Sequence, residues 1–343
     1  MNKILWGVCG IGLGHARRSK LIAENVKANI KFVSYERGYE YLGGVRMEGY
    51  NYRGKEAWSF LLNLFGVIKD FNKIRKSYET LRRYASRFKP DLIVADTEPI
   101  TIHYARMNGK KHLTISNLPL VLDYFDELPV ESASLKIQHK LVEKIEAYME
   151  EEAALVIVPS FKRRKKGKRV YVGPVARCEK DGNDFIYVNV GGHEMERRIM
   201  KKVIRKLKRI DEKFVVASNF MYREYKRVKN IEIYPFVESP EKFISRSKWV
   251  ITTAGLTIIH EAMTAGKPIL AIPIPNHIEQ ITNAYLVEKN RLGEAIIMQK
   301  LDEKTLSRAI EFFVENVEEY KIRRRESGLS LAASLISKQL RNP

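Results

Sequence analysis

The chain has 343 residues, and its 61 lysines and arginines outnumber its 41 aspartates and glutamates, giving a formal net charge of +20. This length favours about two domains, the longest apolar runs are shorter than the ~20 residues of a membrane span, and Cys9 and Cys178 have neither disulfide-type nor zinc-type spacing. The excess charge indicates a polyanionic partner, such as a nucleotide, a nucleic acid or an anionic membrane, or else a highly charged thermophile-type surface.

The N-terminal half alternates short apolar runs with helical stretches, the runs being KILWGVCG, NIKFVSY, DLIVAD, HLTISN and ALVIVP. The first run leads into a glycine turn rather than a cleavage site, so we expect no signal peptide and a cytoplasmic protein. Runs of this kind between helices are typical of buried parallel strands. Residues 161–169 carry seven lysines and arginines without periodicity, which predicts a linker or an exposed loop.

After this break the alternation restarts with DFIYVNV, KFVVAS, IEIYPF, KWVITT, PILAIP and EAIIM. We therefore predict an α/β protein made of two Rossmann-like, doubly wound domains with a cleft between them. The predicted units are an N-terminal domain over 1–160, a linker over 161–180 and a C-terminal domain over 181–320. A last helical stretch covers 321–343.

The stretch GVCGIGLGH places three glycines, Gly10, Gly12 and Gly14, between the first strand and the first helix. The dinucleotide-binding fingerprint needs a third small residue, but that position holds His15 or Arg17, depending on which glycine begins the motif. This mismatch argues against a hydride-transfer enzyme. The loop still allows the backbone to approach a ligand closely at a helix N-terminus, so we expect it on the acceptor side of the cleft.

His15 and Asp96 both follow strands that should end at the same edge of the N-terminal sheet. A carboxylate that holds one imidazole nitrogen leaves the other free to act as a general base. We therefore predict His15 and Asp96 as the catalytic pair, with Glu98 as a competing carboxylate on the acceptor side. Two structural alternatives are that His15 only caps or packs, and that Asp96 caps the next helix.

Gly191 and Gly192 repeat the strand, glycine and helix arrangement, which suits close backbone approach to a diphosphate. In the later stretch TTAGLTIIHEA, the hydroxyl of Thr257 can meet a phosphate at a helix start, and Glu261 follows in position to accept the two hydroxyls of a ribose. Glu279 and Gln280 come after the next strand, and their oxygens suit sugar hydroxyls.

These residues carry a resemblance to the two-domain nucleotide-sugar glycosyltransferases of the GT-B fold, above all to the bacterial N-acetylglucosaminyltransferases that form lipid II and to UDP-glycosyltransferases. The composite motif consists of Gly255, Glu261-Ala262, Gly266-Lys267-Pro268, Ile272-Pro273 and Gln280-Ile-Thr-Asn-Ala284. Two departures stand out: Ala254 replaces a frequent second glycine, and the first loop ends His-Ala-Arg-Arg rather than His-x-x-Pro.

The resemblance implies an inverting transferase that uses a UDP-sugar such as UDP-N-acetylglucosamine, with His15 as base and a C-terminal helix that packs back on the N-terminal domain. It assigns Gly191 and Gly192 to the diphosphate and the backbone of Phe236 and Val237 to the base. It assigns Gly255, Thr257 and Glu261 to the donor nucleotide, and Glu279 and Gln280 to the donor sugar. Helix N-termini and Thr257 would meet the charge on the diphosphate, so we expect no metal and no cofactor.

Residues 57–84 combine an apolar stretch with following basic residues, which suits either a peripheral membrane helix or a buried helix. The resemblance favours a hydroxyl acceptor that is lipid-linked, at the inner face of the cell membrane. A sugar-nucleotide 2-epimerase of the same fold is the main alternative function. A basic nucleic-acid-binding protein is disfavoured, because residues 162–169 lack interleaved aromatic side chains.

Overall fold

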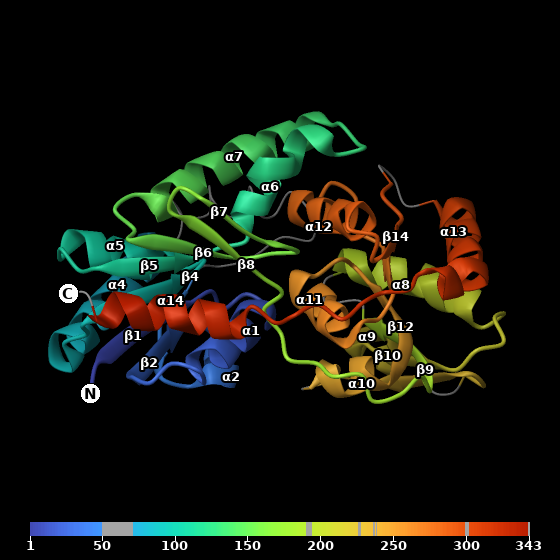
Figure 1. Ribbon diagram of the computed structural model, residues 1–343, viewed down its shortest axis with the longest axis horizontal. Coiled ribbons are helices and arrows are strands. Elements are labelled where there is room, and N and C mark those ends of the chain that lie inside the picture. Colours follow the sequence, from blue (N-terminus) through green and yellow to red (C-terminus); the bar gives the residue numbers. More distant parts are fainter. Residues whose placement is uncertain are drawn as a thin grey trace.

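The computed structural model describes residues 1–49, 71–189, 194–225, 228–235, 237, 239–298 and 302–341. These residues form two β-sheets that lie side by side along the long axis of the molecule, each with helices packed on it (Figure 1). The chain is thus an α/β protein with two doubly wound halves, as the alternation of strands and helices predicts.

The first sheet and its helices form what we call the front lobe. Its strands are β1 (Lys3–Val8), β2 (Asn29–Ser34), β3 (Val45–Arg46), β4 (Leu92–Asp96), β5 (His112–Ile115), β6 (Leu155–Pro159), β7 (Arg163–Lys166) and β8 (Arg169–Gly173). Its helices are α1 (Gly14–Ala23), α2 (Glu36–Leu42), α4 (Phe71–Phe88), α5 (Pro99–Met107), α6 (Leu118–Tyr124), the 3₁₀ turn η1 (Phe125–Glu127) and α7 (Ala133–Glu150).

The second sheet and its helices form the back lobe. Its strands are β9 (Phe185–Asn189), β10 (Phe214–Ala217), β11 (Ile231–Tyr234), β12 (Ser247–Thr252), β13 (Ile269–Ala271) and β14 (Gly293–Ala295). Its helices are α8 (Glu194–Leu207), α9 (Asn219–Glu224), α10 (Pro240–Arg246), α11 (Leu256–Ala265), α12 (Ile278–Lys289), α13 (Glu303–Asn316) and the 3₁₀ turn η2 (Val317–Glu319). The last helix, α14 (Leu329–Arg341), returns to the front lobe and lies along α1 (Figure 1).

The two sheets share one topology. The front lobe has the order β3-β2-β1-β4-β5-β6 and the back lobe has β11-β10-β9-β12-β13-β14, with all these strands parallel. Strand order reverses between β1 and β4 in one sheet and between β9 and β12 in the other. In open parallel sheets, ligands bind beyond the carboxyl ends of the strands at this switch point. The loops after these four strands are therefore where a site is expected.

Residues 163–173 correct one expectation, because they form a β-hairpin and not a loop or linker. Strand β7 pairs antiparallel with β8, which pairs parallel with β6 at the edge of the front sheet. The prediction was wrong because all four β7 side chains are exposed, so no apolar period marks the strand. Arg164 and Lys166 reach the buried carboxylate of Asp123, which anchors the hairpin. An edge strand made of cations also resists pairing with another chain.

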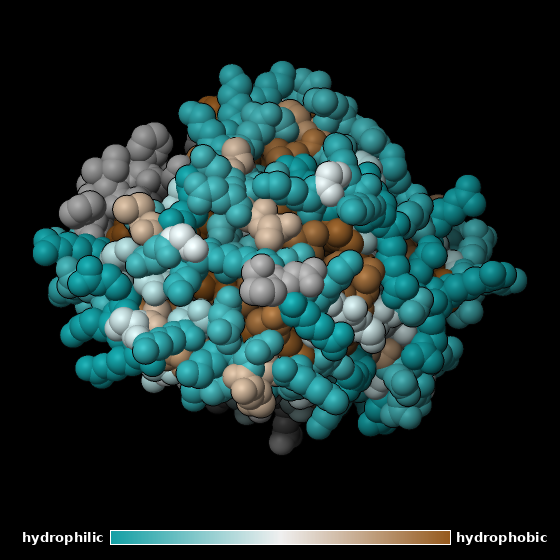
Figure 2. Space-filling model, turned by 60° about the vertical axis from the view of Figure 1, so that its left-hand side comes forward, coloured by the Kyte–Doolittle hydropathy of each residue, from teal (hydrophilic) through white to brown (hydrophobic). Residues whose placement is uncertain are grey.

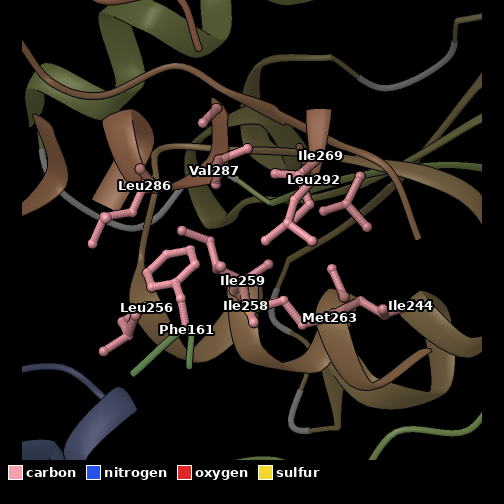
Figure 3. Packing of buried hydrophobic residues seen from close by; sticks show 14 of the residues in the cluster. Phe161, Ile244, Leu256, Ile258, Ile259, Met263, Ile269, Leu286, Val287 and Leu292 are labelled. Atoms are coloured by element: carbon pink, nitrogen blue, oxygen red, sulfur yellow. The ribbon is translucent and has the colours of Figure 1, made fainter. Parts of the chain in front are cut away.

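A hydrophobic cluster joins the two lobes next to the switch points. Phe161 of the front lobe packs in the same cluster as Leu256 and Ile259 of α11, which face Val287 and Leu292 (Figure 3). A second cluster joins α6 and α7 to Ile278 and Ile281 of α12. The lobes are thus held against each other by apolar packing, which brings their strand ends together.

The described surface is mostly hydrophilic on the face shown in Figure 2, where small brown areas are broken up by teal. Among the described residues, no helix combines the length and the apolar composition needed to cross a bilayer. Of the stretch 57–84, residues 57–70 lie outside the described residues. The rest belongs to α4, which buries Leu81 and Ala85 and leaves Arg82 and Arg83 exposed.

Candidate active site

The first glycine loop connects β1 to α1 and places His15 in the first turn of that helix. Gly10 is required by close packing, because a Cβ atom there would lie 2.0 Å from the carbonyl oxygen of Tyr35. Gly12 has a left-handed φ of 71°. Leu13 at the N-cap makes no side-chain capping bond, and the first turn holds no acidic residue. The backbone N–H groups beside His15 are therefore available to an anion or a polar ligand.

Asp96 ends β4 and is completely buried, at the centre of a polar network. Nδ1 of His15 lies 2.9 Å from its Oδ1, and the Ser19 hydroxyl donates to Oδ2 at 2.8 Å. Arg18 donates to both oxygens, with Nε 2.7 Å from Oδ2 and Nη2 bonded to Oδ1. Burial alone would raise the pKa of Asp96, but the charge and hydrogen bonds of Arg18, helped by His15, hold it well below its usual range.

The hydrogen on the His15 ring decides what this network can do. Nδ1 lies 2.9 Å from Nη2 of Arg18 as well as 2.9 Å from Asp96. Arginine only donates and an ionised carboxylate only accepts, so Nδ1 cannot satisfy both in one tautomer. The form that donates to Asp96 leaves Nε2 unprotonated and able to take a proton. The His15 side chain is 23% exposed, so part of the ring is open to a reactant.

The network continues across the lobe interface. Nη1 of Arg18 donates to Oδ1 of Asn117 at 3.0 Å, and Nδ2 of Asn117 donates to Oε1 of Glu279 at 2.9 Å. Asn117 follows β5 of the front lobe, and Glu279 lies in the first turn of α12 of the back lobe. A chain of hydrogen bonds therefore connects His15 and Asp96 with a residue predicted to touch the donor sugar.

Glu98 does not belong to this network, which corrects its predicted place on the acceptor side. Its carboxylate is completely buried and caps α5, accepting from the backbone N–H groups of Ile100 and Thr101 and from the Thr101 hydroxyl. The helix start after β4 is thus capped by Glu98 and not by Asp96, which leaves Asp96 free to hold His15 and Arg18.

The back lobe presents the N-terminus of α11 at its own switch point. The N-cap residue, Gly255, has no side chain to cap the helix, and the first turn contains no acidic residue. The loop before it is held by Asn283, whose Nδ2 donates to the carbonyl of Ala254, a residue with a left-handed φ of 61°. Free N–H groups at a helix start attract phosphate, so this end of α11 suits a diphosphate.

The front lobe approaches α11 closely at two points. The hydroxyl of Thr257 lies 3.4 Å from the carbonyl oxygen of Gly14, where a Cβ atom would come within 3.0 Å of that hydroxyl. One turn further along α11, Oε1 of Glu261 lies 2.7 Å from Nη2 of Arg17. The residues expected on the acceptor side and the donor side therefore meet across one interface.

Glu261 is almost completely buried, with 3% of its side chain exposed, and its Oε2 has no hydrogen-bond partner among the described residues. Burial raises the pKa of its carboxyl to about 7, although Arg17 opposes the shift; Glu241 adds to it. A buried carboxylate oxygen of this kind can accept a hydrogen bond from a ligand. The hydroxyl groups of a sugar ring can satisfy such an oxygen.

The remaining predicted site residues divide into two groups. Oε1 of Gln280 accepts the backbone N–H of Ile274 at 2.9 Å, so this oxygen stabilises its own loop. Val237 is half-buried. Gly191, Gly192 and Phe236 lie outside the residues that the structure describes.

The sequence analysis did not predict three residues of the site: Arg17, Arg18 and Asn117. The two arginines are the point at which the first loop departs from the His-x-x-Pro pattern, and that departure was the available signal. Asn117 had none, because an asparagine after a strand is as typical of a turn or a helix cap as of a site.

Two doubly wound lobes with the switch points of their parallel sheets at one interface define the GT-B fold. A UDP-glucosyltransferase from Polygonum tinctorium, solved in a complex with 3,4-dichloroaniline, has the same fold. The TM-score is 0.68 at 13% identity over 99% of this chain and 98% of that one.

The sequence comparisons lead to the family. The model of glycosyl transferase family 1 matches residues 2–317, and the chain belongs to this family. A glycosyltransferase of undetermined specificity from Methanosarcina acetivorans is 25% identical over 86% of this chain and 85% of its own. The UDP-N-acetylglucosamine–N-acetylmuramyl-(pentapeptide) pyrophosphoryl-undecaprenol N-acetylglucosamine transferase of Thermotoga neapolitana is 26% identical over 81% and 77%. The protein is therefore a glycosyltransferase.

Proposed function

We propose that the protein transfers a sugar from a nucleoside diphosphate sugar to a hydroxyl acceptor with inversion at the anomeric carbon. The observation that carries this proposal is the contact between Arg17 and Glu261. It brings the start of α1, with His15, over the face of α11 that holds a buried carboxylate oxygen, which no described residue bonds. A general base and a nucleotide-binding helix thus face one interface.

In the proposed reaction, Nε2 of His15 takes the proton of the acceptor hydroxyl while Nδ1–H donates to Asp96. The acceptor oxygen attacks the anomeric carbon from the side opposite the diphosphate, and the bond from that carbon to the diphosphate oxygen breaks. The free N–H groups of α11 and the Thr257 hydroxyl stabilise the negative charge that develops on the leaving diphosphate. The chain's own groups meet this charge, so we propose a reaction without metal or cofactor.

For the donor, we propose a UDP-sugar such as UDP-N-acetylglucosamine. The Thermotoga relative, a UDP-N-acetylglucosamine-named transferase, supports this choice. Gly191 and Gly192 are proposed to bind the diphosphate, and the backbone of Phe236 and Val237 the uracil. Glu261 is proposed to bind the ribose, and Glu279 and Gln280 the transferred sugar.

For the acceptor, we propose a lipid-linked hydroxyl compound met at the inner face of the cell membrane, without insertion of a helix. The same relative is named for a polyprenyl-diphosphate acceptor. The exposed arginines of α4, Arg82, Arg83 and Arg87, supply a basic surface that attracts anionic lipid by about 1 kcal/mol per residue near the bilayer.

At low salt, the protein should float with anionic vesicles and not with neutral ones. Flotation that is absent, or equal for both vesicle types, contradicts this part of the proposal.

A thermal-shift screen of nucleotide sugars tests the donor, because a ligand that binds only the native state stabilises it by about 2.7 kcal/mol at 100 times its Kd. UDP-N-acetylglucosamine should raise the melting temperature. Incubation with this sugar nucleotide alone should leave it unchanged, since a transferase needs the acceptor. Turnover to a 2-epimer without acceptor would establish the epimerase instead.

A further inference from the structure

Arg17 lies in the front lobe, but its guanidinium pairs with two carboxylates of the back lobe. Its Nη2 lies 2.7 Å from Oε1 of Glu261 on α11 and 2.7 Å from Oε2 of Glu241 on α10. The Arg17 side chain is 11% exposed, so this guanidinium is largely removed from water together with Glu261. An ion pair in such surroundings is screened far less than one at the surface.

Among the groups around Glu261, Arg17 is the one whose charge favours the ionised carboxylate. Burial raises the pKa of Glu261, and the negative charge of Glu241 on α10 raises it further. The other titratable neighbours are Cys178 and Tyr187. Burial, with a contribution from Glu261, raises the pKa of Cys178 to about 12 and raises that of Tyr187 as well, so both are neutral at physiological pH. Without Arg17, the balance favours a protonated Glu261.

The protonation of Glu261 matters because of what the site has to recognise. An ionised carboxylate accepts hydrogen bonds at both oxygens, as the two adjacent hydroxyls of a ribose require, whereas the protonated acid loses acceptor capacity. Arg17 bonds Oε1, and no residue that the structure describes bonds the buried Oε2. The geometry therefore leaves one whole oxygen and part of the other to a ligand.

We propose that Arg17 is a positioning residue for the donor: it favours the ionised form of Glu261 and orients it so that the carboxylate can accept the ribose hydroxyls. This inference rests on the proposed function, in which Glu261 binds ribose. It assigns to the acceptor-side lobe a direct influence on donor affinity, exerted through a back-lobe carboxylate.

The test measures binding of UDP by calorimetry from pH 6 to pH 9 with wild type, Arg17→Met and Arg17→Lys. Wild-type affinity should rise through pH about 7 as Glu261 loses its proton. Arg17→Met should weaken binding about tenfold or more at pH 7, with the rise moved to higher pH, because hydrogen bonds to a charged group are lost. Arg17→Lys, which keeps the charge, should restore most of the affinity at pH 7.

The ligand 2′,3′-dideoxy-UDP separates this role from a contact with the phosphates. It lacks both ribose hydroxyls, so Arg17→Met should bind it as well as wild type does. The matched control is Arg205→Met, which removes an arginine from an exposed pair with Glu303 in the last turn of α8 and should leave both affinities unchanged. Melting curves establish that each variant is folded.

Four results overturn the inference: unchanged UDP affinity in Arg17→Met, tighter binding, equal weakening at every pH, or the same loss for UDP and the dideoxy ligand. Tighter binding would mean that Arg17 competes with the ribose. Glu261→Ala distinguishes the two levels of argument. If this variant binds UDP as wild type does, the donor assignment itself fails. If it binds weakly while Arg17→Met does not, only the role of Arg17 fails.

Discussion

The two lobes repeat one strand order but use their switch points differently. In the front lobe, Asp96 is bonded by Arg18, Ser19 and His15, so the polar atoms at the end of β4 satisfy each other. In the back lobe, α11 begins without a side-chain cap, and Glu261 has one buried oxygen that finds no partner in the described part of the chain. The front lobe thus builds a rigid support for one imidazole, and the back lobe leaves hydrogen-bonding capacity for a ligand.

The two arrangements suit different tasks, namely proton transfer in the front lobe and ligand binding in the back lobe. A proton-transfer group needs a fixed orientation and tautomer, which a satisfied network provides. A nucleotide site needs donors and acceptors that find their partners only on binding. Substitutions around His15 and Asp96 should therefore affect turnover or stability, and those at Glu261 should affect donor binding.

The largest expected effect comes from His15→Ala. Its turnover with UDP-N-acetylglucosamine and acceptor should fall roughly 10²- to 10⁴-fold, because general base catalysis contributes about that much. Donor affinity should stay close to that of wild type, because in the proposed reaction the imidazole contacts the acceptor and not the donor. Steady-state rates and calorimetry measure the two quantities. Full activity in this variant would exclude His15 as the base.

Asp96→Asn should lower the free energy of unfolding by about 3 kcal/mol at pH 7, because it removes the partner of a buried guanidinium. The folded-state pKa of Asp96 lies below its unfolded value, so its contribution is present above pH about 4 and is lost as the pH falls further. Urea unfolding at pH 7, 5 and 3.5 should show the gap to wild type narrowing only in acid. A gap independent of pH would contradict the charge interaction.

Glu261→Ala should weaken UDP binding by about 10- to 100-fold, the range for hydrogen bonds to a charged group. Stability should not fall at pH 8. Burial raises the pKa of this carboxyl above its unfolded value, so its ionisation costs stability as the pH rises through about 7. The two readouts are calorimetric affinity and urea unfolding. A variant that is destabilised but binds UDP normally would make Glu261 a structural residue.

The fold was predictable from the sequence because buried parallel strands leave apolar runs such as LIVAD and KILWGV, whose order along the chain dictates a doubly wound sheet. The hairpin β7–β8 was not, since its first strand, RRKK, has no apolar face. His15 and Asp96 were brought together correctly by their places at strand ends. Arg17 and Arg18 were missed because the sequence alone does not distinguish an arginine that is solvated from one that is buried and paired with a carboxylate. The role of Glu98 depended on local capping geometry that its position at a strand end did not reveal.

The smallest expected effects compare two hydroxyls, one in each lobe. Ser19 donates to the buried Asp96, so Ser19→Ala should cost about 1.5–3 kcal/mol of stability and little donor affinity. Thr257 makes only a long contact to Gly14, at 3.4 Å, so Thr257→Val should change stability by less than about 0.5 kcal/mol. Its kcat/KM should still fall about tenfold, because a hydrogen bond to a charged group such as the diphosphate is worth at least about 1.5 kcal/mol. Unfolding curves and initial rates for both variants decide the matter. If both substitutions lowered stability and neither lowered kcat/KM, the polar groups at the start of α11 would be satisfied within the protein like those at the end of β4. The proposed difference between the two lobes would then be wrong.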